Sequence, residues 1–413
     1  MRNKMDNILV YSAEKCYVLL NLNNLRMLLI SNESILNIRE ILSQPQYDYF
    51  FDEPKILCEP ETIQINPIIF TGTACNYTCE YCYEQNYSKS NVMLDMPLDN
   101  IDLFYEQYCK HYNIPFKYGV VSLIGGEPLL ETNRVLIERI LKKWKDNKVI
   151  ISTNGVNIMK YWDLLKNRDV ELHVSLDGIK EIHYAKRHPH IENAYEKTIE
   201  GIKCALDNKK TVDIMTVFFP ENANEYILFL DEMEQLGWLK NPCLQLNFIL
   251  KLEGGSDLID AEYYRNCIDT MFDLRKRDKR FMHVHIEKML PGVTCFTLDK
   301  QTSTCNPYAC EKLYMPSYVF NPNGQVSVCT LIQPDKLSVG QYFPEVKVNT
   351  EEIDLLKNRN VNNMDACVEC KYALICKGGC IASTFVKGKD IFSPICDRWK
   401  NTNWMYAYEK LLI

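Results

Sequence analysis

Three cysteines in the spacing C-x3-C-x2-C constrain this chain more than any other feature of its sequence. They are Cys75, Cys79 and Cys82, and they follow a run of apolar residues. Cysteine thiolates bind iron–sulfur clusters, and an ordinary 4Fe-4S cluster takes four of them. A group of three therefore leaves one iron for a ligand that is not protein. A zinc site or three unrelated buried thiols would fit the same spacing, so the remaining residues must decide.

The composition narrows the class of protein and its compartment. With 413 residues, of which 46% are hydrophobic, the chain can bury a large core. Its 18 cysteines indicate either a secreted disulfide protein or an intracellular metal protein. The first residues lack the long apolar core of a signal peptide, and no apolar run reaches the roughly 18 residues that cross a membrane. We therefore expect a cytoplasmic metal protein without a membrane partner, and the net charge of −7 argues against nucleic acid.

From residue 62 the hydrophobic pattern alternates between strands and helices. Strands are predicted at 63–71, 120–124, 149–153, 170–176, 212–218 and 244–250. Helices are predicted between them at 97–112, 131–146, 157–167, 180–208 and 222–237. This alternation is typical of a parallel sheet with crossover helices. In closed barrels of this type the active site lies at the carboxyl ends of the strands.

Residues with useful chemistry follow the predicted strands at these ends. Paired glycines let a backbone approach a ligand closely, a carboxylate accepts hydrogen bonds from an ammonium group, and a guanidinium pairs with a carboxylate. Each motif alone would also fit an ordinary turn or a surface group, but together they line up behind the cysteine triplet. They are Gly125, Gly126 and Glu127 after the second strand, Asn154 after the third, Ser175 with the Asp177-Gly178 turn at the end of the fourth, and Arg187 with His183 on the next helix.

The triplet, with the aromatic Tyr81 directly before its last cysteine, resembles the radical S-adenosylmethionine (SAM) enzymes. The resemblance implies that Cys75, Cys79 and Cys82 hold a catalytic 4Fe-4S cluster, whose fourth iron is chelated by SAM, and that Tyr81 lies near the adenine. Glu127, in a Gly-Gly-Glu-Pro motif, would accept a hydrogen bond from the SAM ammonium group, and Ser175 would also contact SAM. Arg187 would pair with the SAM carboxylate. The implied fold is α/β, a partial (β/α)6 barrel over residues 61–255 followed by a helical linker over 256–300.

A second set of cysteines lies downstream, with a spacing that resembles the SPASM auxiliary cluster domain, here residues 301–413. The interleaved pattern of that domain implies two further 4Fe-4S clusters, and Cys305 is better placed than Cys295 as the eighth ligand. A pair of structural zinc sites would use the same thiols. A hairpin at 322–331 and a final helix at 399–412 are also expected. The first implied ligand set is Cys305, Cys310, Cys329 and Cys380, and the second is Cys367, Cys370, Cys376 and Cys396.

Residues 1–60 form a small N-terminal α+β extension. Three short strands are predicted at 8–11, 17–22 and 26–30, followed by a helix capped by Ser31 or Asn32. This order resembles the start of the leader-peptide recognition domains fused to many peptide-modifying radical SAM enzymes. The alternative is a simple extension that covers the barrel.

The resemblance implies a radical oxidation of a large substrate. SAM would be cleaved reductively to a 5′-deoxyadenosyl radical that abstracts hydrogen, and the auxiliary clusters would carry an electron away. We expect a maturase that installs a cross-link or related modification in a ribosomally made precursor peptide, with a flavodoxin or ferredoxin as external electron donor. The alternatives are an anaerobic sulfatase-maturing enzyme that forms formylglycine, and a non-enzymatic iron–sulfur or zinc scaffold.

Overall fold

The structure is a computed structural model, and it describes most of the chain. The described residues are 8–12, 16–21, 26–31, 37–51, 55–56, 62–86, 95–251, 260–286, 289, 304–305, 308, 310, 312, 315–331, 334–370, 373 and 377–396. Cys376 and the predicted helix at 399–412 lie outside these residues.

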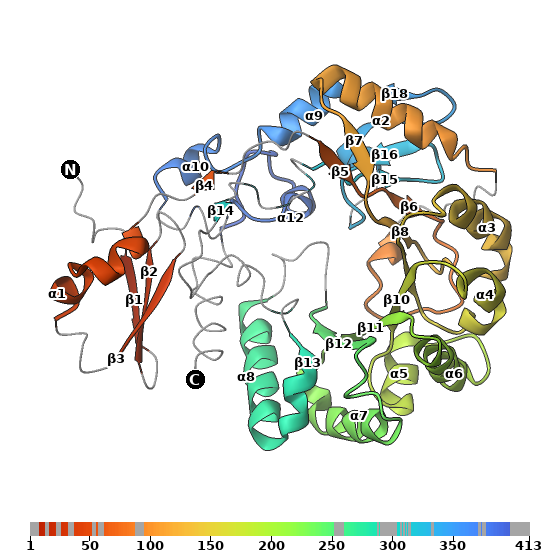
Figure 1. The fold of residues 1–413 in the computed structure, drawn as a ribbon, viewed down its shortest axis with the longest axis horizontal. Helices are drawn as coiled ribbons and strands as arrows, with labels where there is room; N and C mark the ends of the chain where they lie inside the picture. Colours follow the sequence, from red (N-terminus) through yellow and green to blue (C-terminus); the bar gives the residue numbers. More distant parts are fainter. Residues whose placement is uncertain are drawn as a thin grey trace.

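A parallel sheet curves through the centre of the molecule, and the predicted six strands are confirmed (Figure 1). Its strands follow one another in sequence order across the sheet. They are β6 (Ile68–Phe70), β8 (Val121–Ile124), β9 (Val149–Thr153), β10 (Val170–Ser175), β11 (Thr211–Val217) and β12 (Leu244–Ile249).

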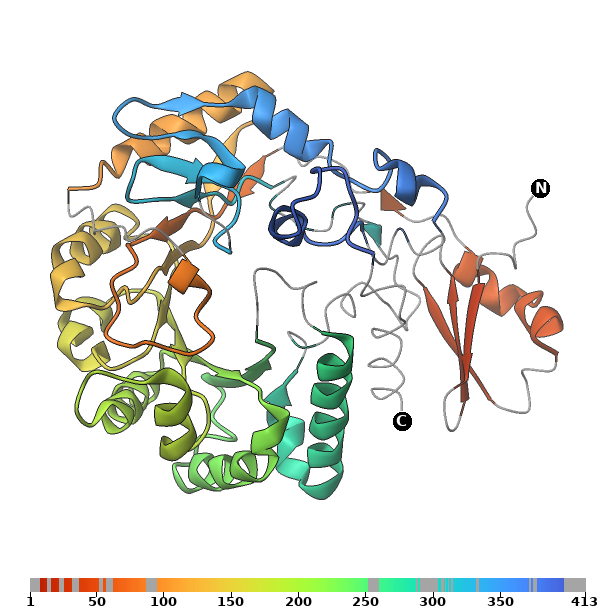
Figure 2. The ribbon, with the colours of Figure 1, turned by 180° about the vertical axis from the view of Figure 1, so that it is seen from behind.

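Helices cover the outer side of this sheet, as Figures 1 and 2 show. Along β10, Val170, Leu172 and Val174 belong to the core shared with the helices, whereas Ser175 lines a cavity on the inner side. Successive side chains of a strand point to opposite faces, so the inner face carries the polar positions. The helices are α2 (Asp99–Tyr112), α3 (Arg134–Lys143), α4 (Ile158–Leu165), α5 (Lys180–Arg187), α6 (Ala194–Asp207) and α7 (Ala223–Gln235).

Two predicted elements are divided in the structure. The single helix expected at 180–208 is wrong: α5 ends at Arg187, His188 adopts a left-handed φ of 45°, and Pro189 cannot donate a helical hydrogen bond. The first predicted strand is divided at Asn66 and Pro67 into β5 (Ile63–Ile65) and β6, and β5 pairs instead with β7 (Phe116–Tyr118).

The sheet also extends beyond its six central strands at both edges. Helix α8 (Ala261–Arg277) connects β12 to a short parallel strand, β13 (Val284–His285), so the sheet continues past residue 255, where the barrel was expected to end. At the other edge β15 (Val319–Phe320) pairs with β6 in parallel. Three antiparallel neighbours follow: β16 (Gln325–Ser327), β17 (Ser338–Gln341) and β18 (Lys347–Val348).

The carboxy-terminal part is built from this strand extension and short helices. The predicted hairpin is confirmed, since β15 and β16 are antiparallel and Gly324 turns between them with a φ of 86°. Three helices follow: α9 (Thr350–Lys357), α10 (Asp365–Val368) and α12 (Ile381–Val386). The 3-10 helices of the chain include η2 (Pro45–Phe51), η3 (Tyr83–Asn86), η4 (Glu131–Asn133), η5 (Pro220–Asn222), η7 (Lys279–His283) and η11 (Pro334–Leu337).

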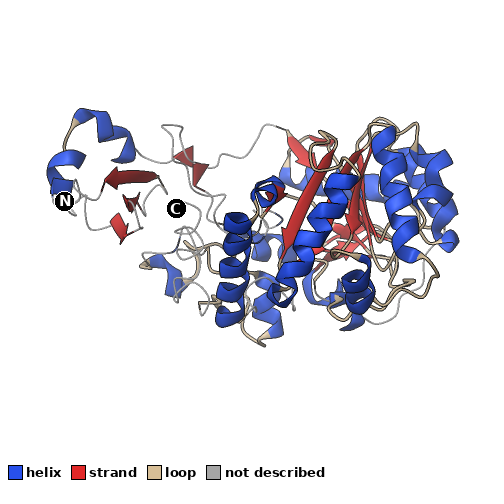
Figure 3. Ribbon diagram, turned by 90° about the horizontal axis from the view of Figure 1, so that it is seen from below, coloured by secondary structure: helices blue, strands red, loops and turns tan. Residues whose placement is uncertain are grey.

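The N-terminal residues form a separate small unit (Figures 1 and 3). Strands β1 (Ile8–Ser12), β2 (Cys16–Asn21) and β3 (Met27–Ser31) make an antiparallel sheet. Helix α1 (Ile38–Leu42) begins after Asn37, whose side chain makes no cap hydrogen bond, so the cap expected at Ser31 or Asn32 is wrong. A core cluster of this unit includes Leu19, Leu28, Ile30, Leu42 and Phe50.

The N-terminal unit lies beside the carboxy-terminal region and not over the barrel (Figures 1 and 3). Strand β4 (Lys55–Ile56), which follows the unit in the chain, pairs in parallel with β14 (Thr304–Cys305). The alternative of an extension that covers the barrel is therefore wrong. Among the described residues, no helix combines the length and the apolar character needed to cross a membrane.

Candidate active site

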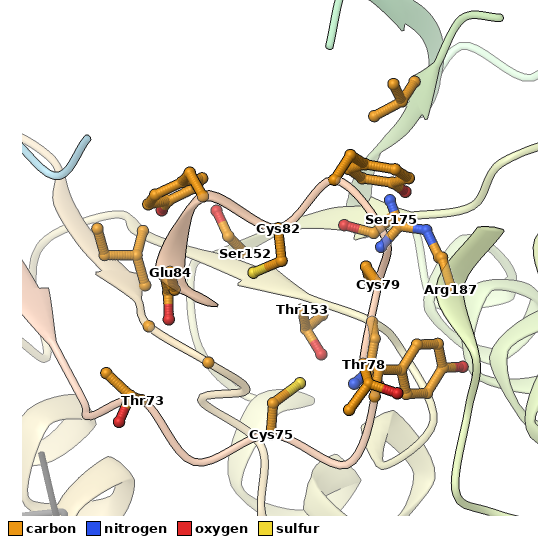
Figure 4. A pocket seen from close by; sticks show the side chains of 18 of the residues that line it. Thr73, Cys75, Thr78, Cys79, Cys82, Glu84, Ser152, Thr153, Ser175 and Arg187 are labelled. Carbon is orange, nitrogen blue, oxygen red and sulfur yellow. The ribbon is translucent and has the colours of Figure 1, made fainter. Parts of the chain in front are cut away.

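A cavity of about 770 Å³ opens at the carboxyl ends of the parallel strands, and all three cysteines of the triplet line it. They lie on the loop that follows β6, and Figure 4 shows their side chains around one space. Thr73 and Glu84 border this space on one side, and Ser175 and Arg187 border it on the other. The triplet and the strand ends therefore lie together around one cavity, as predicted.

The thiols of the triplet suit a metal cluster by their number and surroundings. Burial raises the pKa of Cys75 to about 12 and that of Cys79 to about 11. Thiolates at such positions are stabilised by a bound metal cation, since metal binding requires and favours the deprotonated form. Three thiols on one loop, beside a cavity of this size, fit an iron–sulfur cluster that Cys75, Cys79 and Cys82 would hold.

The backbone of Gly126 and Glu127, in the Gly-Gly-Glu-Pro motif, binds the cysteine loop to the end of β8. Gly126 N donates to the Gly72 carbonyl over 2.7 Å, and Glu127 N donates to the Ala74 carbonyl over 2.9 Å. A Cβ atom on Gly126 would lie 2.3 Å from the Ala74 carbonyl oxygen. Both glycines also line the cavity, so the motif brings the backbones of β8 and the cysteine loop into direct contact.

Glu127 points away from the cavity, although the motif led us to expect it at the SAM ammonium. Its side chain is only 1% exposed and is not part of the cavity wall. The carboxylate accepts hydrogen bonds from Leu129 N at 2.8 Å, from Thr153 Oγ1 at 2.7 Å and from Asn154 N at 2.7 Å. In the structure Glu127 therefore holds the turn after β9, and a direct contact with SAM stays a prediction.

Asn154 and Ser175 both lie where the sequence predicts, in the cavity wall. Asn154 donates from Nδ2 to Asn76 Oδ1 over 2.6 Å, which connects the turn after β9 to the cysteine loop. Its carbonyl accepts from Thr198 Oγ1 at 3.0 Å. Ser175 is the last residue of β10 and faces the same space (Figure 4).

Arg187 and Tyr81 line the cavity, and both are bonded to the buried carboxylate of Asp177. Arg187 donates from Nε and Nη2 to Asp177, at 2.9 and 3.1 Å. The Tyr81 hydroxyl donates to the same side chain. Burial by itself lowers the pKa of Arg187. The Asp177 carboxylate outweighs this effect and holds the pKa of Arg187 above its usual value. If Arg187 paired with the SAM carboxylate, as expected, that carboxylate would share the guanidinium with Asp177, which already binds it.

His183 is fully buried next to this network, so its reading as an ordinary surface histidine is wrong. Asp177 N donates to Nδ1 over 3.4 Å, which leaves the ring proton on Nε2, 3.3 Å from the Tyr77 hydroxyl. Burial, together with the charge of Arg187, lowers the pKa of His183 to about 3. The imidazole is therefore neutral and acts as a fixed hydrogen-bonding group behind the cysteine loop.

Glu84 is a cavity residue that the sequence analysis missed. It lies two residues beyond Cys82, lines the cavity and is 9% exposed, and its Oε2 atom has no hydrogen-bond partner. Burial raises its pKa to about 7, although a hydrogen bond from Tyr83 opposes this. No spacing rule singles out Glu84, because its burial depends on the fold of the loop.

Downstream, the structure brings together three cysteines of the first predicted auxiliary set. Burial, with the neighbouring thiols of Cys380 and Cys310, raises the pKa of Cys329 to about 11. Leu331 N donates to the Cys329 sulfur over 3.3 Å. The fourth predicted member, Cys305, lies on β14.

The second predicted auxiliary set also gathers in part. Burial and the thiols of Cys396 and Cys370 raise the pKa of Cys367. The buried Arg359 donates to the carbonyls of Gly378 and Gly379, at 3.4 and 3.0 Å, just before Cys380. Gly378 has a φ of 76°, and a Cβ atom there would lie 2.0 Å from Met364 Cε. The turn between the two sets is therefore closely packed.

Comparison with known proteins identifies the barrel. Residues 69–233 match the model of the radical SAM superfamily. This part of the chain is therefore similar to the radical SAM enzymes. The similar proteins are named as cyclases and maturases, so the protein is an enzyme, and the alternative of a non-enzymatic scaffold is wrong.

The similar proteins differ in how much of the chain they cover. A probable GTP 3′,8-cyclase of Saccharolobus islandicus is 27% identical over 216 residues, which are 51% of this chain and 67% of the relative. The solved structure of the sulfatase maturase anSMEcpe with AdoMet and the Kp18Cys peptide has a TM-score of 0.60 at 20% identity, covering 84% of this chain and 98% of its own. SuiB of Streptococcus suis bound to its precursor peptide SuiA has a TM-score of 0.56 at 14% identity, covering 96% and 100%.

The buried neutral His183 predicts a pH dependence of stability. Its pKa in the folded protein, about 3, lies below the unfolded value of about 6.5, so the unfolded chain takes up the proton first. Stability is therefore lost as the pH falls through 6.5 towards 3. Between about pH 7.5 and about pH 5.5 the free energy of unfolding should fall by roughly 1.4 kcal/mol more in the native protein than in His183→Gln. Urea denaturation at both pH values measures this, and equal pH dependence would contradict it.

The close contact at Gly126 predicts a selective loss of iron. In Gly126→Ala the new Cβ would collide with the Ala74 carbonyl and displace the loop of the triplet. After anaerobic reconstitution this variant should bind about four iron atoms fewer than the native protein. Gly237→Asn is the control, because Gly237 has a φ of 73° with open space around it, a conformation that Asn tolerates. Full iron content in Gly126→Ala would show that the loop does not depend on this contact.

Proposed function

We propose that this enzyme is a peptide maturase that uses SAM to oxidise a ribosomally made precursor peptide and installs a cross-link or related modification. The observation that carries the proposal is the cavity: Cys75, Cys79 and Cys82 line it together with Ser175 and Arg187 at the strand ends. A cluster on the three thiols would supply the electron that cleaves SAM to a 5′-deoxyadenosyl radical. Structural neighbours solved with AdoMet and with peptides support this assignment.

The protein's own groups would position the reagents. Asn154 and Ser175, in the cavity wall, would contact SAM, and Tyr81 would lie near its adenine. Glu127 holds the turn of Asn154 through two hydrogen bonds, from Thr153 Oγ1 and Asn154 N. Since the bound groups would be held by strand ends and a docked loop, the target carbon of the peptide can be kept in a reactive position.

The carboxy-terminal residues 301–413 are proposed to be a SPASM domain with two further 4Fe-4S clusters. Cys305, Cys310, Cys329 and Cys380 would bind one cluster, and Cys367, Cys370, Cys376 and Cys396 the other. The grouping of Cys310 and Cys380 around Cys329, and of Cys370 and Cys396 around Cys367, supports this interleaved arrangement. The two clusters would carry the electron of the oxidised substrate away, and a flavodoxin or ferredoxin type donor in the cytoplasm would supply the electron that cleaves SAM.

A peptide substrate is favoured by the N-terminal unit. The SuiB structure, solved with a precursor peptide, matches over 96% of this chain, whereas anSMEcpe matches over 84%. The difference corresponds in size to the N-terminal extension of residues 1–60. We propose that this extension takes part in recognising the precursor, ahead of a barrel over residues 61–255 and a linker over 256–300.

Two other substrate classes are alternatives to the precursor peptide. Formylglycine formation on a sulfatase is the alternative favoured by the TM-score of 0.60 with anSMEcpe. The GTP 3′,8-cyclase relatives cover only about half of the chain, so they support shared SAM chemistry more than a shared substrate.

SAM cleavage tests the catalytic assignment directly. Reconstituted protein with a strong reductant should convert SAM to 5′-deoxyadenosine, and Cys79→Ala should lose this activity because the cluster would lose a ligand. Cys204→Ala is the matched control, since Cys204 lies on α6, outside the cavity. Chromatography of the nucleoside product measures the rates. Normal turnover in Cys79→Ala would exclude the triplet as the catalytic centre.

The substrate class is tested by offering three substrates side by side. They are synthetic peptides encoded by short reading frames next to the gene, a sulfatase-derived peptide with Cys or Ser at the target position, and GTP. We expect a peptide from the neighbouring reading frames to lose hydrogen and to accelerate 5′-deoxyadenosine formation, as mass spectrometry would show. Formylglycine in the sulfatase peptide, or consumption of GTP, would replace the proposed function with the corresponding alternative.

A further inference from the structure

One buried carboxylate joins four elements that meet at the cavity. Asp177 lies two residues beyond the end of β10, and none of its side chain is exposed. Its Oδ2 accepts from Arg187 Nε at 2.9 Å and from the Tyr81 hydroxyl. Its Oδ1 accepts from Arg187 Nη2 at 3.1 Å and from Val217 N at 3.0 Å. The carboxylate thus connects the cysteine loop, α5 and the end of β11 to the end of β10.

Each donor to Asp177 is itself part of the cavity wall. Tyr81 lies between two cysteines of the triplet, Arg187 is on α5, and Val217 ends β11, and all three line the cavity. Asp177 does not line the cavity. Any effect of Asp177 on a bound ligand would therefore pass through these three neighbours.

The arrangement of Tyr81 and Arg187 strengthens the connection. The Arg187 guanidinium carbon lies 5.5 Å from the centre of the Tyr81 ring, a distance at which a cation attracts an aromatic face. The ring of Tyr81 is therefore in contact with the cation, and its hydroxyl is bonded to the anion. A phenylalanine would keep the first interaction and lose the second.

A buried ion pair favours one arrangement of its charged groups over other, similar arrangements. A buried ion pair gains little stability over apolar packing, but it penalises any arrangement that leaves one charge without its partner. Hydrogen bonds in a low dielectric environment also strengthen one another. Displacing the cysteine loop relative to β10 would remove the Tyr81 bond from Asp177, so small displacements of this loop are opposed.

We propose that Asp177 is a positioning residue, which through Tyr81 and Arg187 sets the cysteine loop at the distance from the ends of β10 and β11 that SAM requires. SAM would bind the cluster at one end and the strand ends at the other, so its affinity depends on that distance. Binding of the cluster would depend on the shape of the loop, which its contacts with Gly126 and Glu127 hold, and not on the bond to Asp177. The inference rests on the proposed binding of SAM in this cavity and is independent of the peptide substrate.

Tyr81→Phe tests the proposal with the smallest change, because it removes one hydroxyl and keeps the ring. The variant should reconstitute with the same iron content as the native protein and bind SAM about tenfold more weakly, as the loss of a hydrogen bond to a charged group implies. SAM should also shift the EPR spectrum of its reduced cluster less. Equilibrium dialysis with SAM and EPR with and without SAM provide these readouts.

Tyr112→Phe is the matched control. It removes a hydroxyl bonded to a carboxylate, here Asp354 at 2.7 Å, at a position outside the cavity. Asp177→Asn and the double variant with Tyr81→Phe complete a cycle. If the hydroxyl acts through Asp177, adding Tyr81→Phe to Asp177→Asn should weaken SAM binding no further.

The possible outcomes separate this proposal from the proposed function. Native affinity and a native EPR shift in Tyr81→Phe would overturn the positioning role. Loss of iron from Tyr81→Phe, with the control unchanged, would also overturn it, because the contact would then serve cluster binding. Failure of the native protein itself to bind SAM would refute the proposed function first.

Discussion

The backbone contact between the cysteine loop and the end of β8 is the constraint on which the site depends. Gly126 and Glu127 donate to the carbonyls of Gly72 and Ala74, and Glu127 then holds Asn154 through its backbone N–H. Asn154 returns to the loop through its bond with Asn76. These hydrogen bonds connect the cysteine loop both to the end of β8 and to the end of β9. The loop that carries the triplet is therefore held by two strands.

A second connection restrains the same loop from the opposite side. Tyr81 meets Asp177 at the end of β10, and Tyr77 meets the neutral His183 on α5. Both tyrosines lie between cysteines of the triplet, so the sequence intervals x3 and x2 each contribute one anchoring side chain. The spacing of the triplet therefore serves the protein framework as well as a cluster.

The sequence was sufficient for the strands and for the convergence of the motifs, since apolar runs with the right spacing determine both. It also contains the signal that separates α5 from α6, because Pro189 cannot continue a helix. It could not predict the direction of Glu127, because the partners of its carboxylate, Thr153 and Asn154, are brought to it only by the neighbouring strand. Glu84 was missed for the same reason, because its burial in the cavity wall depends on how the loop folds.

The continuity of the sheet connects the radical SAM barrel to the carboxy-terminal region. Strand β15 pairs with β6, and Ile68 N donates to the Tyr318 carbonyl over 2.9 Å. β6 leads directly into the loop of Cys75, while β16, the partner of β15, leads to Cys329. Backbone hydrogen bonds within one sheet therefore fix these two thiols relative to each other. The positions of these two cysteine segments therefore depend on the sheet and not on a separate linker.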